Sequence, residues 1–293
     1  MIGKAVSDMM IKPGKAPVFE TPDKYGLEYE DVSFKTKDGV ILSGWIVKGN
    51  TDKVVIQSHF GVQCSRSGFT IEGKGMMGKM LWNKDIHFLN QAKYLVDAGY
   101  SVLMYDLRNH GDSGSGEEEW ITWGLNERND VVAAVEFISN HEEYKDANIG
   151  LLSICMGAAS TTFAYGMEDN LQSNPKIKSM IAVQPLTYDY FIENLGLPKF
   201  MANAGSKYSK NKRNVDLTGD SFLPFAKDVK VPTMVIQNKN DNMTDLEMVE
   251  QYYDSLEVEK KYLSLDLEKK RAAAYDWLGK NPDEILEWFG KYV

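Results

Sequence analysis

Apolar residues in this chain form six short, continuous runs, and the segments between them repeat apolar positions every three or four residues. The runs are rich in Val, Ile, Leu and Tyr and are too short for most helices, so they predict buried parallel strands. They lie at 54–58, 100–105, 149–153, 177–183, 231–237 and 261–267. Apolar stripes of helical period, expected to cover the sheet, fall within 86–96, 131–138, 246–256 and 285–289.

A hairpin is expected ahead of these runs. Residues 29–36 and 40–47 are separated by a turn at Asp38-Gly39, which is a strong hairpin signal. The first 25 residues carry three prolines and are predicted to form an extended arm. A hairpin followed by alternating strands and helices predicts one domain over residues 1–293, with a mostly parallel, doubly wound α/β sheet.

One interval between strands is too long for a plain connection. Residues 185–230 contain several aromatic residues, among them Tyr188. We interpret this interval as a partly helical lid over a pocket, with a crossover helix and a long loop as the alternative. Two helix starts are also expected, a capping box at Thr244 and Glu247 and a cap at Asn281 ahead of Pro282.

The strongest candidate for chemistry is Cys155. An apolar strand ends at Ser153-Ile154-Cys155-Met156-Gly157, and an alanine-rich segment that can begin a helix follows. A sharp turn from strand to helix needs small residues two positions before and after the exposed side chain, and Ser153 and Gly157 meet that need. The helix N-terminus beneath such a cysteine favours the thiolate.

Three further segments, in order along residues 29–293, resemble landmarks of the α/β-hydrolase family. The first is His59-Phe60-Gly61 after a strand, similar to the turn that precedes the family's oxyanion loop. The second is the turn at 105–114, which resembles the family's Asp-x-Arg-x-His-Gly-x-Ser motif. The third is the strand 231–237 with Asp241 after it, where the family carries its catalytic acid. The resemblance implies an α/β-hydrolase fold.

The resemblance also implies roles for individual residues. Cys155 corresponds to the nucleophile and Asp241 to the acid, with Asp245 as an alternative acid. The N–H of Met156, together with that of Phe60 or Gly61, would form the oxyanion hole. A cysteine nucleophile is similar to that of dienelactone hydrolases and polyhydroxyalkanoate synthases, which pair it with His and Asp.

The histidine that the resemblance requires after the last strand is missing. The four histidines are His59, His87, His110 and His141, and none follows Asp241. Counting back from the final helix, the expected place holds Arg271 or an adjacent alanine. Arginine cannot accept a proton but can stabilise an anion, and Asp241 either pairs with Arg271 or is a relic.

Other residues remain open for this role. His87 is a possible substitute, whereas His59 and His110 are interpreted as structural and His141 as exposed. Tyr188 and Tyr275 are expected to line the substrate pocket, as is the stretch 63–84, which contains Met76, Met77, Met80 and Trp82. Cys64 follows the strand next to that of Cys155, so the two thiols are either close or unrelated.

Composition narrows the function. The formal net charge is −9 and the basic residues around 207–213 are interpreted as a solvated loop, which argues against nucleic acid. No apolar segment reaches membrane-span length, and two cysteines in 293 residues suggest a reducing, cytoplasmic setting. No metal-ligand spacing, cofactor motif or phosphate loop is present, and the oligomeric state stays open.

The sequence therefore predicts an acyl hydrolase or acyl-transfer enzyme that uses Cys155 on a small ester, thioester or lactone. Two alternatives remain. One is an enzyme of another reaction type that holds an anionic substrate with Arg271 and Tyr275. The other is a non-catalytic binding or regulatory protein built on a degraded hydrolase.

Overall fold

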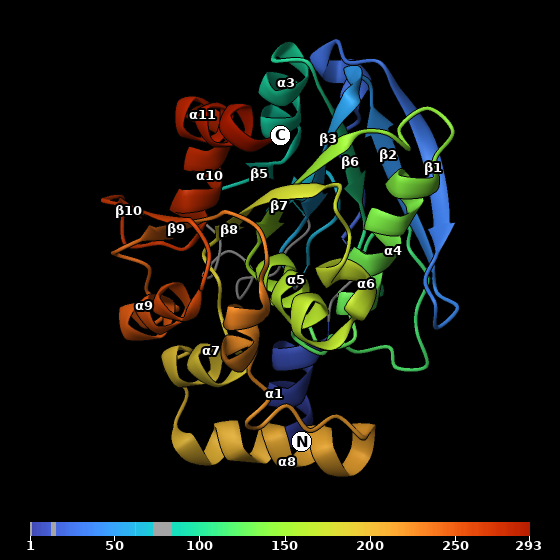
Figure 1. Cartoon of the computed structure of the whole chain (residues 1–293). Coiled ribbons are helices and arrows are strands. Elements are labelled where there is room, and N and C mark those ends of the chain that lie inside the picture. Colours follow the sequence, from blue (N-terminus) through green and yellow to red (C-terminus); the bar gives the residue numbers. More distant parts are fainter. Residues whose placement is uncertain (1, 13–15, 62, 73–83) are drawn as a thin grey trace.

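An eight-stranded sheet forms the centre of the molecule in the computed structural model, which describes residues 2–12, 16–61, 63–72 and 84–293 (Figure 1). The order of the strands is β1-β2-β6-β3-β7-β8-β9-β10, with β2 antiparallel to both neighbours and all pairs from β6 to β10 parallel. The strands are β1 Tyr29–Lys35, β2 Ile41–Val47, β3 Asn50–Ser58, β6 Tyr100–Tyr105, β7 Asn148–Ile154, β8 Ile177–Val183, β9 Thr233–Asn238 and β10 Lys260–Leu265. The predicted hairpin and all six predicted strands are present, with ends shifted by a few residues.

Helices cover both faces of this sheet. In Figure 1, α3, α10 and α11 lie on one side, and α4, α5 and α9 lie on the other. Their bounds are α3 Leu89–Asp97, α4 Arg128–Asn140, α5 Met156–Met167, α6 Asp169–Gln172, α9 Leu246–Ser255, α10 Ala272–Lys280 and α11 Asp283–Tyr292. The central strands β6 and β7 are almost completely buried, because both faces of the sheet are covered.

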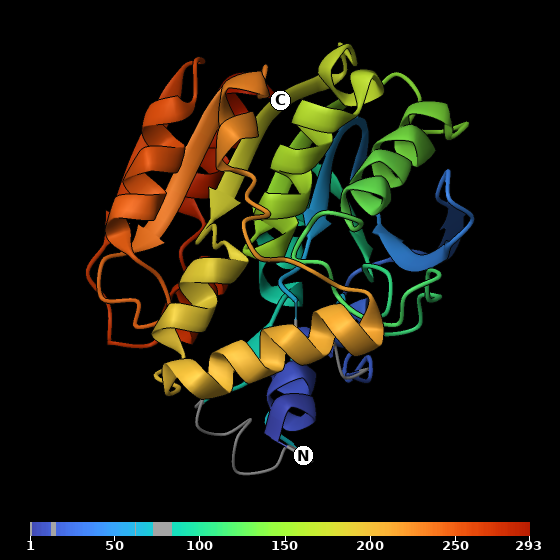
Figure 2. The same cartoon turned by 90° about the horizontal axis from the view of Figure 1, so that it is seen from below.

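A third group of helices lies at one end of the sheet. The group consists of α1 Ile2–Ile11, α7 Tyr188–Asn194 and α8 Lys199–Arg213, and α1 crosses α8 in both views (Figures 1 and 2). The interval 185–230 is thus partly helical, as expected, and it ends in the short helix η2 Leu223–Asp228. Whether it acts as a lid stays a prediction.

Several local predictions were wrong. The N-terminal arm is not extended but holds α1 and the short helix η1 Pro22–Tyr25. Ile86 belongs not to a helix but to β5 Ile86–His87, which pairs with β4 Gly68–Phe69. The basic residues 207–213 belong to α8, not to a loop, and the side chain of Arg213 is only 6% exposed.

Two predicted helix caps were also wrong. Asp245, not Thr244, caps α9, because its carboxylate accepts a hydrogen bond from the N–H of Glu247. Pro282, not Asn281, is the cap position of α11, and Asn281 instead ends α10. Among the described residues, no helix has the length and apolar character needed to cross a membrane.

Candidate active site

Cys155 occupies a sharp turn between β7 and α5. Its backbone has φ 52° and ψ −105°, a conformation that is costly for a residue with a side chain, and its N–H donates to the carbonyl of Val183 at 2.8 Å. A Cβ on Gly157 would overlap the carbonyl oxygen of Ser58, so α5 begins in close contact with β3. The small residue expected at position 157 is therefore required by this contact.

A small cavity opens beside the thiol of Cys155, and Cys155 as a whole is 7% exposed. The volume of the cavity is about 50 Å³, which is space for only a few water molecules. Its walls are Met9, Phe60, Gly61, Ile121, Trp123, Cys155, Met156, Leu186, Phe191, Met243 and Arg271. Among these residues, only Cys155 and Arg271 bring a reactive or charged side chain to an otherwise apolar space.

Arg271 is held in place from two directions. Its Nη1 donates to the carboxylate of Asp241 and its Nη2 to the carbonyl oxygen of Gln184, while the Gln184 amide donates to the Arg271 carbonyl at 2.9 Å. The Asp241 carboxylate also accepts the N–H of Met243 at 3.0 Å. Arg271 is only 1% exposed. The predicted pairing of Asp241 with Arg271 is confirmed.

The charge of Arg271 is secured by its surroundings. Burial by itself would lower the pKa of the guanidinium, but its interactions with Cys155, Tyr275 and the Asp241 carboxylate outweigh burial and raise the pKa. The side chain therefore stays protonated and cannot take a proton from water. Arg271 therefore brings a permanent positive charge to the wall of the cavity that Cys155 also lines.

Tyr275 lies behind the cavity wall. Its ring stacks on that of Phe60, with centroids 4.8 Å apart and planes 14° from parallel. Burial, to which the charges of Cys155 and Asp241 add, raises the pKa of its phenol well above 10, so the hydroxyl stays neutral. Contrary to expectation, Tyr275 does not line the cavity, although it is electrostatically linked to Cys155 and Arg271.

Tyr188 was also predicted to line the pocket, and it does not. It lies in α7 with its ring edge against Trp123, which does line the cavity, and its hydroxyl is 3.3 Å from Ser206 Oγ. Tyr188 instead faces a separate surface groove together with Asp189 and Glu193.

The residues expected to form an oxyanion hole do come together. Phe60, Gly61 and Met156 all line the cavity beside Cys155. A Cβ on Gly61 would lie 2.8 Å from the Met156 sulfur, so a larger residue there would displace that side chain. Within the described residues, the N–H groups of Gly61 and Met156 donate no backbone hydrogen bond outside the helices and strands, so both remain candidate donors for an oxyanion hole.

None of the four histidines lines the cavity. His59 is buried, donates from Nδ1 to the Phe60 carbonyl at 2.6 Å and accepts the Leu107 N–H at Nε2. Burial and the neighbouring His110 lower the pKa of His59 to about 3, so it is a neutral structural residue. His87 lies 3.0 Å from the Glu20 carboxylate and against Phe19, away from the cavity wall. His141 is partly buried against Phe137, not exposed as expected.

The remaining sequence candidates lie elsewhere. Asp245 is exposed and occupied as the α9 cap. Cys64 is buried and donates to the Ser65 carbonyl at 3.4 Å, and neither Cys64 nor Cys155 is in a disulfide. Of the stretch 63–84, residues 73–83 fall outside the described part of the chain, and residues 63–72 and 84 do not line the cavity.

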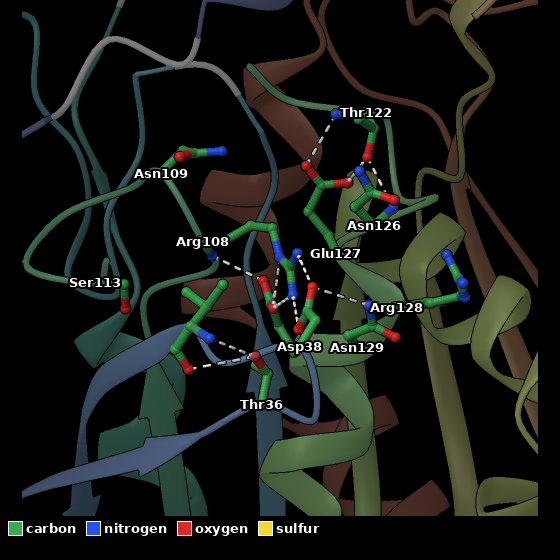
Figure 3. A network of polar contacts seen from close by, with 12 residues as sticks. Thr36, Asp38, Arg108, Asn109, Ser113, Thr122, Asn126, Glu127, Arg128 and Asn129 are labelled. Carbon is green, nitrogen blue, oxygen red and sulfur yellow. Dashed lines mark hydrogen bonds and ion pairs between the residues drawn. The ribbon is translucent and has the colours of Figure 1, made fainter. Parts of the chain in front are cut away.

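The turn at 105–114 does not line the cavity. Its side chains form a network of polar contacts that holds neighbouring segments together (Figure 3). Arg108 donates to the carboxylates of Asp38 and Asp130, both within 3.0 Å. Asp106 forms a buried ion pair with Arg66. These contacts join the hairpin turn, the β6 turn and α4.

The walls that sequence reasoning missed are Met9, Ile121, Trp123 and Met243, whereas Leu186 and Phe191 belong to the interval 185–230 that was expected to cover a pocket. Only Met9 carried a local signal, because Val6, Met9 and Met10 are spaced as the apolar face of a helix. The others meet only after folding.

The order of the strands, the turn at Cys155 and the acid position after β9 define the α/β-hydrolase fold. Solved structures agree. Esterase Pf2001 of Pyrococcus furiosus matches with a TM-score of 0.70 and 22% identity over 96% of this chain and 97% of that one. A dienelactone hydrolase from Anabaena variabilis matches with a TM-score of 0.56 and 16% identity over 91% and 99% of the two chains.

A hypothetical protein of Pseudomonas aeruginosa, PA2218, has a TM-score of 0.60 and 16% identity over 94% and 97% of the two chains. At these identities the likeness is one of fold. No family model matches the chain, and no curated protein is significantly similar to it in sequence.

Proposed function

We propose that this protein is a cysteine-dependent acyl-transfer enzyme that acts on short acyl thioesters and activated esters. The observation that carries the proposal is the position of Cys155, strained at the start of α5 and facing a small cavity beside the buried Arg271. The esterase and the dienelactone hydrolase of the same fold support an acyl substrate by analogy. A reducing cytoplasm, in which both cysteines stay free thiols, suits this chemistry.

In the first half-reaction, the Cys155 thiolate attacks the carbonyl carbon of the substrate. The proposed reactive form is the thiolate, which needs no base at this step, and the start of α5 and the Arg271 guanidinium place positive charge beside it. The carbonyl oxygen becomes an oxyanion that accepts the N–H of Met156 and that of Phe60 or Gly61. The carbon–sulfur bond to the leaving group then breaks, and a thiolate departs from a thioester without requiring a proton.

The second half-reaction distinguishes transfer from hydrolysis. Water must lose a proton as it attacks the Cys155 thioester, and general base catalysis contributes about 10²–10⁴-fold to such steps. Arg271 cannot take this proton, and no histidine lines the cavity. An acceptor thiolate needs no base: its sulfur bonds to the acyl carbon, and Cys155 leaves as the thiolate. We therefore expect transfer to thiols to be faster than hydrolysis.

The test is intact-protein mass spectrometry after mixing with acetyl and propionyl thioesters and activated esters, with Cys155→Ala and Cys64→Ala alongside. We expect the native protein and Cys64→Ala to gain the mass of the acyl group and Cys155→Ala to gain none. An added low-molecular-weight thiol should then remove the adduct faster than water alone. Folded native protein that forms no adduct would instead favour the non-catalytic binding role.

A further inference from the structure

We infer that helix α1 completes the acyl pocket, and that Met9 limits the length of the group that can reach Cys155. This inference deepens the proposed function, on which its acyl substrate rests. Met9 is the one residue of α1 among the cavity walls, more than 140 positions before Cys155 in the sequence. The question is whether the structure fixes Met9 at that place.

The C-terminal end of α1 is joined to the cavity wall by two hydrogen bonds. The N–H of Ile121 donates to the Ile11 carbonyl at 3.0 Å, and the Trp123 indole donates to the Met10 carbonyl at 3.1 Å. Ile121 and Trp123 themselves line the cavity. The turn of α1 that carries Met9 is thus bound directly to two other walls.

Close packing against α8 fixes the other side of α1. A Cβ on Gly3 would lie 2.7 Å from the Ala204 carbonyl oxygen, and one on Gly205 would lie 2.5 Å from Val6 Cγ1. Both glycines are therefore needed for the two helices to approach this closely. Such contact leaves α1 little freedom to slide along α8.

A buried polar cluster locks the crossing of α1 and α8. Ser7 Oγ and Ser209 Oγ are 2.7 Å apart, and Arg213 donates to Ser7 Oγ at 2.7 Å while forming an ion pair with Asp8. The guanidinium also lies over the Trp120 ring, 3.8 Å from its centroid. Because Trp120 adjoins Ile121, this cluster connects α8 and α1 to the loop that carries the cavity residues Ile121 and Trp123.

The cavity that results is narrow and apolar. Trp123 contacts Phe191 of α7, with ring centroids 4.5 Å apart, and Met9 completes the enclosure. A methionine side chain is unbranched and extends far from its backbone, so truncating it adds length to a cavity of only about 50 Å³. A longer acyl chain should then fit, whereas a bulkier residue at position 9 should exclude all but the smallest group.

The experiment measures the size limit without depending on acyl chemistry. Methyl, propyl and hexyl methanethiosulfonates react with a thiol to form a mixed disulfide and release methanesulfinate, so each transfers an alkylthio group of known length. Rates are taken from intact masses in a Cys64→Ala background, so that Cys155 is the remaining thiol. The variants are Met9→Ala, Met9→Trp and Met10→Ala. Met10→Ala, in the same helix but outside the cavity, is the matched control for loosened packing of α1.

We expect Met9→Ala to raise the ratio of hexyl to methyl rates by about tenfold or more, the usual discrimination of a few methylenes in an apolar pocket. Met9→Trp should lower the ratio, and Met10→Ala should leave it within about twofold of the native value. A Met9→Ala ratio equal to the native one overturns the inference. An equal change of the ratio in Met10→Ala would also overturn it. The same holds if none of the reagents modifies Cys155 in the folded protein. Failure of the proposed function is distinguishable, because it gives this length dependence with no acylation by thioesters.

Discussion

The guanidinium of Arg271 forms a buried ion pair with the carboxylate of Asp241, at the place where the resemblance to α/β-hydrolases implies a histidine. The exposed fractions of the two side chains are 1% and 0%. The acid position is thus occupied and oriented, but its partner is a permanent cation instead of a base. Under the proposed function, this substitution would separate formation of an acyl-enzyme, which needs only a thiolate, from its hydrolysis, which needs a proton acceptor.

Restoring a base at this position should restore hydrolysis. In Arg271→His, the imidazole can pair with Asp241 and accept a proton from water, as in a complete triad. We expect the acyl group on Cys155 to decay at least about tenfold faster than in the native protein. The measurement is the loss of adduct mass with time after excess substrate is removed. Arg271→Gln, which supplies neither charge nor base, is the control, and equal decay in the two variants would contradict the prediction.

The ion pair should also control stability. Asp241→Asn leaves the Arg271 charge buried without its partner, and such a loss typically costs about 3–5 kcal/mol in the free energy of unfolding. The double variant Asp241→Leu with Arg271→Met removes both charges and should cost clearly less than the sum of its single changes. Urea unfolding of the native protein, Asp241→Asn, Asp241→Leu, Arg271→Met and the double variant measures both effects. Additive losses would show that the two side chains act independently.

Acidic pH should destabilise the protein through His59. Its pKa in the folded protein is held at about 3 by burial, while the unfolded chain takes up a proton near the ordinary value of 6.5. Lowering the pH below 6.5 therefore favours unfolding, by about 2 kcal/mol between pH 7.5 and pH 5. Burial lowers the pKa of His110 as well, so it adds a loss of the same sign.

The measurement is the free energy of unfolding in urea at the two pH values, for the native protein, His59→Asn and His141→Gln. His59→Asn should lose stability at both values but show a smaller difference between them. His141→Gln should keep the native difference, because that side chain lies outside the buried pair. An unchanged difference in His59→Asn would refute the assignment.

The sheet was predictable because burial on both faces leaves a direct signal. Strands such as 100–105 and 149–154 have almost no exposed side chain, so their residues are nearly all apolar. The turn at Cys155 was predictable for a related reason, since the contact of Gly157 with β3 admits only the smallest residue. The place of Arg271 followed from counting back from the last helix.

Helix α1 was not predictable in the same way. Short helices gain most of their stability from tertiary packing, and α1 is held by α8, which lies about 200 residues away. The prolines that follow it suggested an extended arm, and nothing local opposed that interpretation. The caps at Asp245 and Pro282 differ from the predicted ones by a single residue, a shift that propensity does not resolve.

The sequence by itself determined the strands, their alternation with helices, the cysteine in its turn and the absence of a histidine after Asp241. Each of these is set by neighbours along the chain or by burial of a whole segment. The tertiary structure decided which side chains surround Cys155. Met9, Trp123, Phe191 and Arg271 come from four distant segments, and only the packing of α1, α7 and α8 at one end of the sheet brings them to one cavity. No local pattern along the chain predicts this contact, because each of these residues fits its own helix or loop equally well whether or not the distant segments pack together.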